Sequence, residues 1–178
     1  MVKSGLVDDP NVSQYRLTAH LGMAVFIYSL ILWTVFDLSL NYNHAIRSRI
    51  KWMSSTLTLL IFLMILSGGL VAGTRAGIPF PTWPLMGDTF IPPQIYSMNP
   101  SWLSAFEDMA TIQFNHRMFA YLLTIFIVIF AIVLLRSNVP RFLKNGTTAL
   151  LFVLSLQVVL GISTLIFYIP IPVAAAHQ

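Results

Sequence analysis

Long apolar runs, separated by shorter polar turns, dominate the hydrophobic pattern of this chain. Four of these runs, at residues 17–40, 52–72, 114–135 and 147–169, are long enough to cross a bilayer as a helix, which takes about 20 apolar residues. A fifth run, 171–178, is too short. The pattern predicts an all-α integral membrane helical bundle, with four complete transmembrane helices and the start of a fifth.

The composition agrees with a membrane environment. Hydrophobic residues make up 57% of the chain and charged residues 9%, whereas an ordinary soluble domain is about 25% charged. Nothing indicates a second, soluble domain, so residues 1–178 are predicted to form one membrane domain in contact with lipid. The ten Lys and Arg are scattered without a basic run, which argues against nucleic acid as a partner. There is no cysteine, so any metal chemistry has to use histidine.

Basic residues in the turns predict the orientation of the helices. They cluster in the inner loop at 41–51 and in the turn after residue 135: Arg47, Arg49, Lys51, Arg136, Arg141 and Lys144. The positive-inside rule places both turns on the cytoplasmic or matrix face. The tail and helix at 1–40 then run from outside to inside, and the loop 74–113 lies outside. That loop holds six prolines with Trp83 and Trp102, which predicts a folded outer cap.

Three histidines occupy equivalent places in this topology. His20, His116 and His177 each lie near the start of a helix that enters from the outer face, so their imidazoles are predicted to share one membrane depth. An intramembrane ionisable residue is a functional candidate, although a single one can also bond a neighbouring helix or lie at headgroup level. Three in register favour a functional site. His44, in the inner turn, is interpreted as a solvated loop residue.

Haem suits these imidazoles better than zinc or copper, because the helices hold no carboxylate at that depth to complete a metal site. Haem needs one or two axial ligands, an apolar slot and cations for its propionates. Arg16, Arg75 and Arg117 can supply the cations or, alternatively, anchor the helices at the interface. Gly69, Gly73 and Gly77 are spaced for close helix packing, with the approach of a macrocycle as the alternative.

Several sequence motifs together resemble the haem A synthase family. They are VSQYRLTAHL (12–21), GGLVAG (68–73), TWPLMGD (82–88), QFNHR (113–117), LGIST (160–164) and AHQ (176–178). The order and spacing of the motifs match that family along essentially the whole chain. The resemblance implies an eight-helix protein made of two similar halves, of which this chain is an internal fragment lacking the first helices and most of the last.

The resemblance also implies roles for the histidines. His116 and His177 would be the axial iron ligands of haem b in the second half. His20 would belong to the catalytic site for haem O, with its partner histidine on a helix before Met1. The implied oxidoreductase reaction converts the C8 methyl of haem O to the formyl of haem A for cytochrome oxidase biogenesis. The implied partners are haem O, haem A, haem O synthase and terminal oxidase assembly factors.

Two alternatives remain on the residues alone. One is a non-catalytic membrane carrier of electrons with b-type haem, and the other is a transporter or assembly scaffold whose polar residues only pack helices. The membrane is expected to be the bacterial cytoplasmic membrane or the mitochondrial inner membrane. The start of the chain, Met1 to Gly5, resembles neither a signal peptide nor a presequence, which favours the bacterial membrane.

Overall fold

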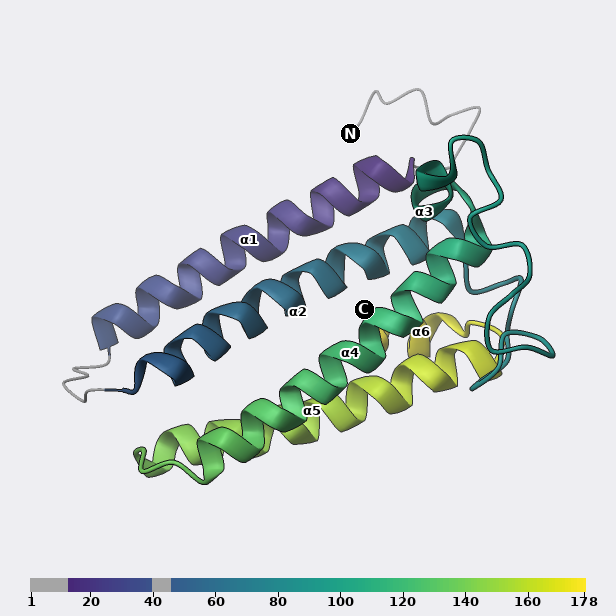
Figure 1. Ribbon diagram of the computed structural model, residues 1–178. Coiled ribbons are helices and arrows are strands. Elements are labelled where there is room, and N and C mark those ends of the chain that lie inside the picture. The colour runs from purple at the N-terminus through teal and green to yellow at the C-terminus, as the bar shows by residue number, and fades with distance from the viewer. Residues whose placement is uncertain (1–12, 40–45) are drawn as a thin grey trace.

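The computed structural model describes residues 13–39 and 46–178. Within these residues the chain forms four long helices: α1 (Gln14–Ser39), α2 (Ser48–Thr74), α4 (Met109–Leu135) and α5 (Arg141–Ile166). A short helix, α6 (Ile171–His177), follows them (Figure 1). All four long helices are long and apolar enough to cross a membrane. The predicted all-α membrane bundle is confirmed, and the chain is an integral membrane protein. His44 lies outside the described residues.

Several helix boundaries differ from the sequence prediction, among them the start of α5 at Arg141 rather than at residue 147. Helix α4 begins at Met109, before the predicted residue 114, because Asp108 caps it: its carboxylate accepts a 2.8 Å hydrogen bond from the backbone N–H of Thr111. Helix α2 begins at Ser48, inside the predicted inner loop 41–51. Helix α5 ends at Ile166 rather than at residue 169, since Tyr168 and Ile169 both adopt a positive φ of 59° in the turn that leads into α6.

The helices pack in sequence, α1 against α2, α2 against α4, α4 against α5, and α6 back against α5. Figure 1 shows the turn between α4 and α5 at the same end of the bundle as the end of α1. The segment between α2 and α4, together with α6, lies at the opposite end, which is called the outer end here after the predicted orientation. The basic turns are therefore separated from the long loop by the length of the helices, as the charge pattern predicts.

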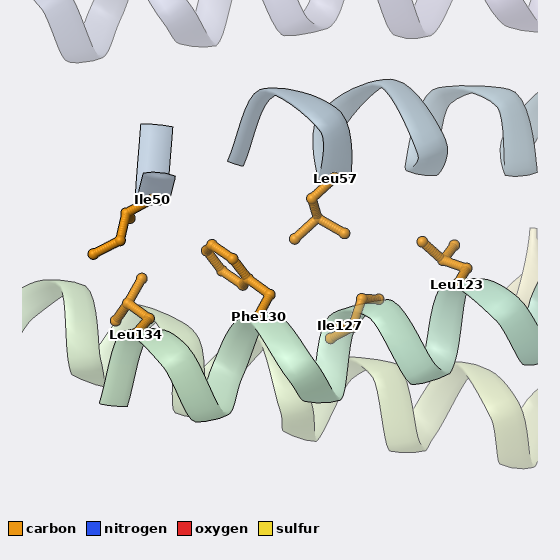
Figure 2. Packing of buried hydrophobic residues seen from close by; sticks show 6 residues of the cluster. All are labelled: Ile50, Leu57, Leu123, Ile127, Phe130 and Leu134. Atoms are coloured by element: carbon orange, nitrogen blue, oxygen red, sulfur yellow. The ribbon is translucent and has the colours of Figure 1, made fainter. Parts of the chain in front are cut away.

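The contact between α2 and α4 forms the main apolar core. Figure 2 shows six buried side chains at this contact, and they come from α2 (Ile50, Leu57) and from α4 (Leu123, Ile127, Phe130, Leu134). The α4 members recur every three or four residues, which is the spacing of one helix face. Most other large apolar side chains are exposed, such as Trp33 at 74% and Leu38 at 82%. A protein whose helices turn such residues outward is suited to lipid as its solvent.

Small residues bring α1 and α2 close together. A Cβ added to Gly73 would lie 2.6 Å from the Cα of Gln14, and one added to Gly69 would lie 3.2 Å from the Cα of Thr18. The prediction of close helix packing is confirmed for these two glycines. Helix α1 thereby covers the face of α2 that carries Gly69 and Gly73, so this face is not open to a macrocycle. Gly77 lies beyond the end of α2 and contacts Ile169 instead.

The outer loop is folded, as predicted, and its folded part is called the cap here (residues 76–108). It contains a 3-10 turn, η1 (Ser101–Leu103), and one short helix, α3 (Ser104–Glu107). Backbone N–H groups of the cap donate to buried hydroxyls, Met98 to Ser104 at 3.1 Å and Tyr96 to Thr111 at 3.1 Å. Hydroxyls that are buried in this way order a loop without regular structure.

Two side chains of α4 fasten the cap to the bundle. The guanidinium of Arg117 donates hydrogen bonds to the carbonyls of Phe80 (3.0 Å), Thr82 (2.8 Å) and Leu85 (3.2 Å). Gln113, one helical turn earlier, donates to the same Phe80 carbonyl at 3.0 Å. Arg117 is 6% exposed and Gln113 2% exposed. Their loss would leave partly buried carbonyls unpaired, which costs more than the loss of a surface hydrogen bond.

The cap is also tied to the start of α1. The carboxylate of Glu107 accepts a hydrogen bond from the side chain of Gln14 at 2.9 Å and another from the hydroxyl of Tyr15. Glu107 belongs to α3, which leads directly into α4. The cap therefore connects the outer ends of α1 and α4.

The glycine contact between α1 and α2 gives a first prediction. Gly73→Ala should destabilise the protein by about 1–3 kcal/mol, because the added Cβ overlaps backbone rather than a flexible side chain. Unfolding in detergent micelles, by heat or by added SDS, would measure this. Gly146→Ala is the control, since nothing lies within 4 Å of its new Cβ, and it should stabilise α5 by about 0.5–1 kcal/mol. Equal effects of the two substitutions would contradict the packing described.

Arg117 gives a second prediction, about the cap. In Arg117→Ala the carbonyls of Phe80, Thr82 and Leu85 lose their donor, so the loop should open and be cleaved several-fold faster by an added protease in limited proteolysis. Arg117→Lys should rescue this only in part, because a single ammonium cannot reproduce the guanidinium fork. The matched control is Arg136→Ala, at the exposed inner end of α4. A wild-type cleavage rate in Arg117→Ala would show that the cap does not depend on this residue.

Candidate functional site

Two imidazoles lie near one another at the outer end of the bundle. His116 lies in the second turn of α4 and His177 is the last residue of α6. The two rings are close enough for their charges to interact. The sequence placed these histidines 61 residues apart, and the structure brings them together because α6 folds back along α5. We call His116 and His177 the histidine pair.

His116 is held by residues of α2. The hydroxyl of Ser67 lies 3.0 Å from the Nδ1 of His116. The next residue, Gly68, has no side chain, and a Cβ added there would lie 3.6 Å from the Cε1 of His116. The imidazole is thus bonded on one nitrogen and lies beside bare backbone.

His177 is seated on α5. A Cβ added to Gly161 would lie 2.8 Å from the Cε1 of His177 and 3.2 Å from its Nε2, so the ring occupies the space above this glycine. One turn earlier, the side-chain amide of Gln157 donates to the backbone carbonyl of His177 at 2.9 Å. The Nδ1 of His177 is buried and has no hydrogen-bond partner within 13–39 and 46–178. A buried ring nitrogen without a hydrogen-bond partner from these residues can interact with a group that the chain itself does not supply.

His20 lies apart from the histidine pair. It is in the second turn of α1, at the same end of the bundle (Figure 1), but its side chain is exposed. The α1 residues that contact α2 include Thr18 and Leu21, which lie beside Gly69. The three histidines therefore lie toward the same end of the bundle, as predicted, and of the three the structure places His116 and His177 near one another. The role of His20 in a substrate site stays a prediction.

The three arginines take different positions. Arg117 is buried and donates to the cap, as described above. Arg75 follows α2 in the left-handed conformation (φ 55°) and ends that helix. Arg16 is exposed on α1, one helical turn before His20. Binding of propionates by any of them stays a prediction, and for Arg117 the structure adds a role in holding the cap.

The histidine pair can supply two axial ligands to the iron of a flat macrocycle. Within the described part of the chain, no group of three or more His, Cys, Asp or Glu is placed to hold a metal ion by protein ligands alone. A haem brings its own four equatorial nitrogens and needs only the axial positions. The glycines beside each ring, which let the imidazoles lie close to the backbone, fit such a group.

Two residues of this site were not found from the sequence. Ser67 and Gln157 carry no charge and lie in apolar runs, where a hydroxyl or an amide more often bonds its own helix. A signal for Ser67 was its place directly before Gly68 and Gly69. Three small residues in a row, at the depth of a histidine on another helix, indicate close approach. For Gln157 we find no such signal.

Comparison with known proteins agrees with the resemblance stated above. The sequence model of the COX15-CtaA family, described as cytochrome oxidase assembly protein, matches residues 1–178. Among similar proteins, the haem A synthase of Nitrosospira multiformis is 45% identical over 183 residues, and that of Parvibaculum lavamentivorans is 40% identical over 181 residues. Haem A synthase COX15 of Bos taurus is 38% identical over 188 residues.

The similarity covers 100% of this chain in each case, but only 51%, 51% and 46% of those three relatives. The chain thus spans about half the length of the curated relatives it matches. No solved structure matches it significantly. Since the family match extends over the whole sequence, the chain belongs to the COX15-CtaA family of cytochrome oxidase assembly proteins.

Proposed function

We propose that this chain is part of a haem A synthase in which the histidine pair holds a haem b and His20 contributes to the site for haem O. The observation that carries the proposal is that His116 of α4 and His177 of α6 lie near one another, each beside a glycine of a neighbouring helix. Relatives named haem A synthase, at 36–45% identity, support it. The reaction we propose is oxidation of the C8 methyl group of haem O, through an alcohol, to the formyl group of haem A.

The residues of the chain would hold the macrocycle in place. His116 of α4 and His177 of α6 would hold the iron of the macrocycle through their imidazoles. Because Gly161 and Gly68 have no side chain, the rings of His177 and His116 can lie close to the backbones of α5 and α2. Apolar helices on either side exclude water, and burial of this kind shifts the redox potential of a haem. When bound, haem b would supply one-electron redox chemistry.

The second site would lie on the exposed face of α1 that carries Arg16 and His20. Arg16 stands one turn closer to the outer boundary than His20, which suits a cation that meets the propionates of haem O while the imidazole reaches its iron. Haem O synthase and oxidase assembly factors are the partners we propose. The membrane we propose is a bacterial cytoplasmic membrane, as the alternative to the mitochondrial inner membrane.

Substitution of the histidines tests the proposal. In the complete protein, purified from membranes, His116→Ala or His177→Ala should abolish the bis-histidine low-spin signal in the reduced-minus-oxidised optical spectrum, because an axial ligand is lost. His20→Ala should keep that signal and lose the conversion of haem O to haem A, measured by chromatography of extracted haems.

The outcomes distinguish three functions: a haem A synthase, an electron carrier, and a transporter or scaffold. A wild-type low-spin spectrum in both His116→Ala and His177→Ala would show that the pair does not bind haem. A wild-type protein that holds haem b but never yields haem A would indicate the electron carrier considered above. A protein without any b-type band would leave only the transporter or scaffold reading.

Gly161 provides a test that spares the ligands. Gly161→Val should displace the His177 ring, because even its Cβ would lie 2.8 Å from Cε1 and on the rigid backbone of α5. The low-spin haem content should then fall at least several-fold, read from the same spectrum. Gly146→Val is the control, since this glycine lies on the same helix in open space. Equal haem content in both variants would argue against the seat described for His177.

A further inference from the structure

Many hydroxyl groups of the long helices follow a common rule. Nine of them donate to the backbone carbonyl four residues earlier in their own helix, at 2.7–3.1 Å. These are Ser29, Thr34, Ser54, Thr58, Thr74, Thr147, Thr148, Ser155 and Thr164. Such a bond satisfies the hydroxyl locally where water is absent.

Ser67 bonds across helices instead. Its Oγ lies 3.0 Å from the Nδ1 of His116, 49 residues away in the sequence, in a partly buried contact between α2 and α4. On the same helix Ser54 follows the common rule and donates to Ile50 at 2.9 Å. The different behaviour of Ser67 is therefore set by its neighbour and not by the environment of α2.

The direction of this bond decides what His116 can do. A neutral imidazole has one N–H and one lone pair. When Nδ1–H donates to the Ser67 oxygen, Nε2 presents its lone pair and can bind iron. When the hydroxyl donates to Nδ1, Nε2 carries the proton and cannot. A serine oxygen can accept such a bond, so the contact is compatible with a ligating tautomer.

We propose that Ser67 is a positioning residue for the haem site, which accepts a hydrogen bond from Nδ1–H of His116 and so fixes its tautomer, its ring plane and its strength as a ligand. This inference rests on the proposed binding of haem b. An acceptor on the distal nitrogen makes the imidazole a stronger donor to the metal. A stronger donor stabilises the ferric over the ferrous state, so Ser67 lowers the reduction potential.

The two ligands are not equivalent in this respect. His177 has no corresponding acceptor on its Nδ1 among the described residues, and its ring is held by contact with Gly161. The His116 ring is therefore oriented by a hydrogen bond, and the His177 ring by packing against Gly161. The electronic effect of a hydrogen-bond acceptor is expected on the His116 side only.

The test compares variants of the complete protein with haem bound. Ser67→Ala removes the acceptor, Ser67→Thr keeps a hydroxyl, and Ser54→Ala removes an equally placed hydroxyl on the same helix that bonds its own backbone. Redox titration followed in the optical spectrum gives the potential of the low-spin haem, and electron paramagnetic resonance of the ferric form reports the orientation of the axial rings.

In Ser67→Ala we expect a potential shifted to more positive values and altered g values, with haem content close to wild type. Ser67→Thr and Ser54→Ala should keep the wild-type potential and g values. Unchanged potential and g values in Ser67→Ala, with low-spin haem present, would overturn the role of Ser67 and leave the haem site standing. Equal shifts in Ser54→Ala would also overturn it, because the effect would then be general to α2. A wild-type protein without low-spin haem would contradict the proposed function itself.

Discussion

Polar atoms within a bilayer have to find partners without water, and this constraint determines where the polar side chains of the chain lie. Backbone groups are satisfied by the helices themselves, and many helix hydroxyls by the carbonyl four residues earlier, as at Thr58 and Thr164. What remains is a small set of side chains at the outer end that bond between elements. Ser67 with His116, and Arg117 with the cap, belong to this set. The candidate site contains polar side chains that form hydrogen bonds with other elements and not within their own helix.

Small residues complement this constraint, because they let backbones and rings approach where a larger side chain would intervene. Gly69 and Gly73 join α1 to α2, whereas Gly161 admits an imidazole. The lack of a side chain thus has two uses in one molecule: it lets α1 pack closely against α2, and it lets the His177 ring lie against α5. The difference lies in what faces the glycine: the backbone of α1 near Gln14, or the side chain of His177.

The sequence predicts the helices well and the site in part. Apolar run length is a strong signal, so all four spans were found, while their ends depend on single residues such as Asp108, whose capping bond a hydropathy pattern does not contain. The shared outer end of the histidines follows from alternating helix direction. Which histidines lie near one another does not follow from the sequence, because it depends on which helices are neighbours in the bundle. His20 could be placed at the right end of the bundle but not on the exposed face of α1.

Arg117 illustrates a further limit of the sequence. A cation next to a histidine suggested a partner for an anionic group, but the structure shows its guanidinium bonded to three backbone carbonyls of the cap. Carbonyl acceptors are present in every residue and leave no trace in a sequence. Only the fold of the cap brings those of Phe80, Thr82 and Leu85 together at one point.

The cap also determines how the two sides of the bundle are related. In Figure 1 α2 lies between α1 and α4, so the helix of His20 and the helix of His116 are spaced by the width of α2. At the outer end the cap forms a second connection between α1 and α4. Glu107 accepts a hydrogen bond from the start of α1, and Arg117 holds the loop to α4. Two independent links between the same helices resist both translation and tilt. The spacing of His20 from the histidine pair is therefore built into the fold, through the contacts of α2 with α1 and with α4 along the helices and through the polar links of the cap at their outer end.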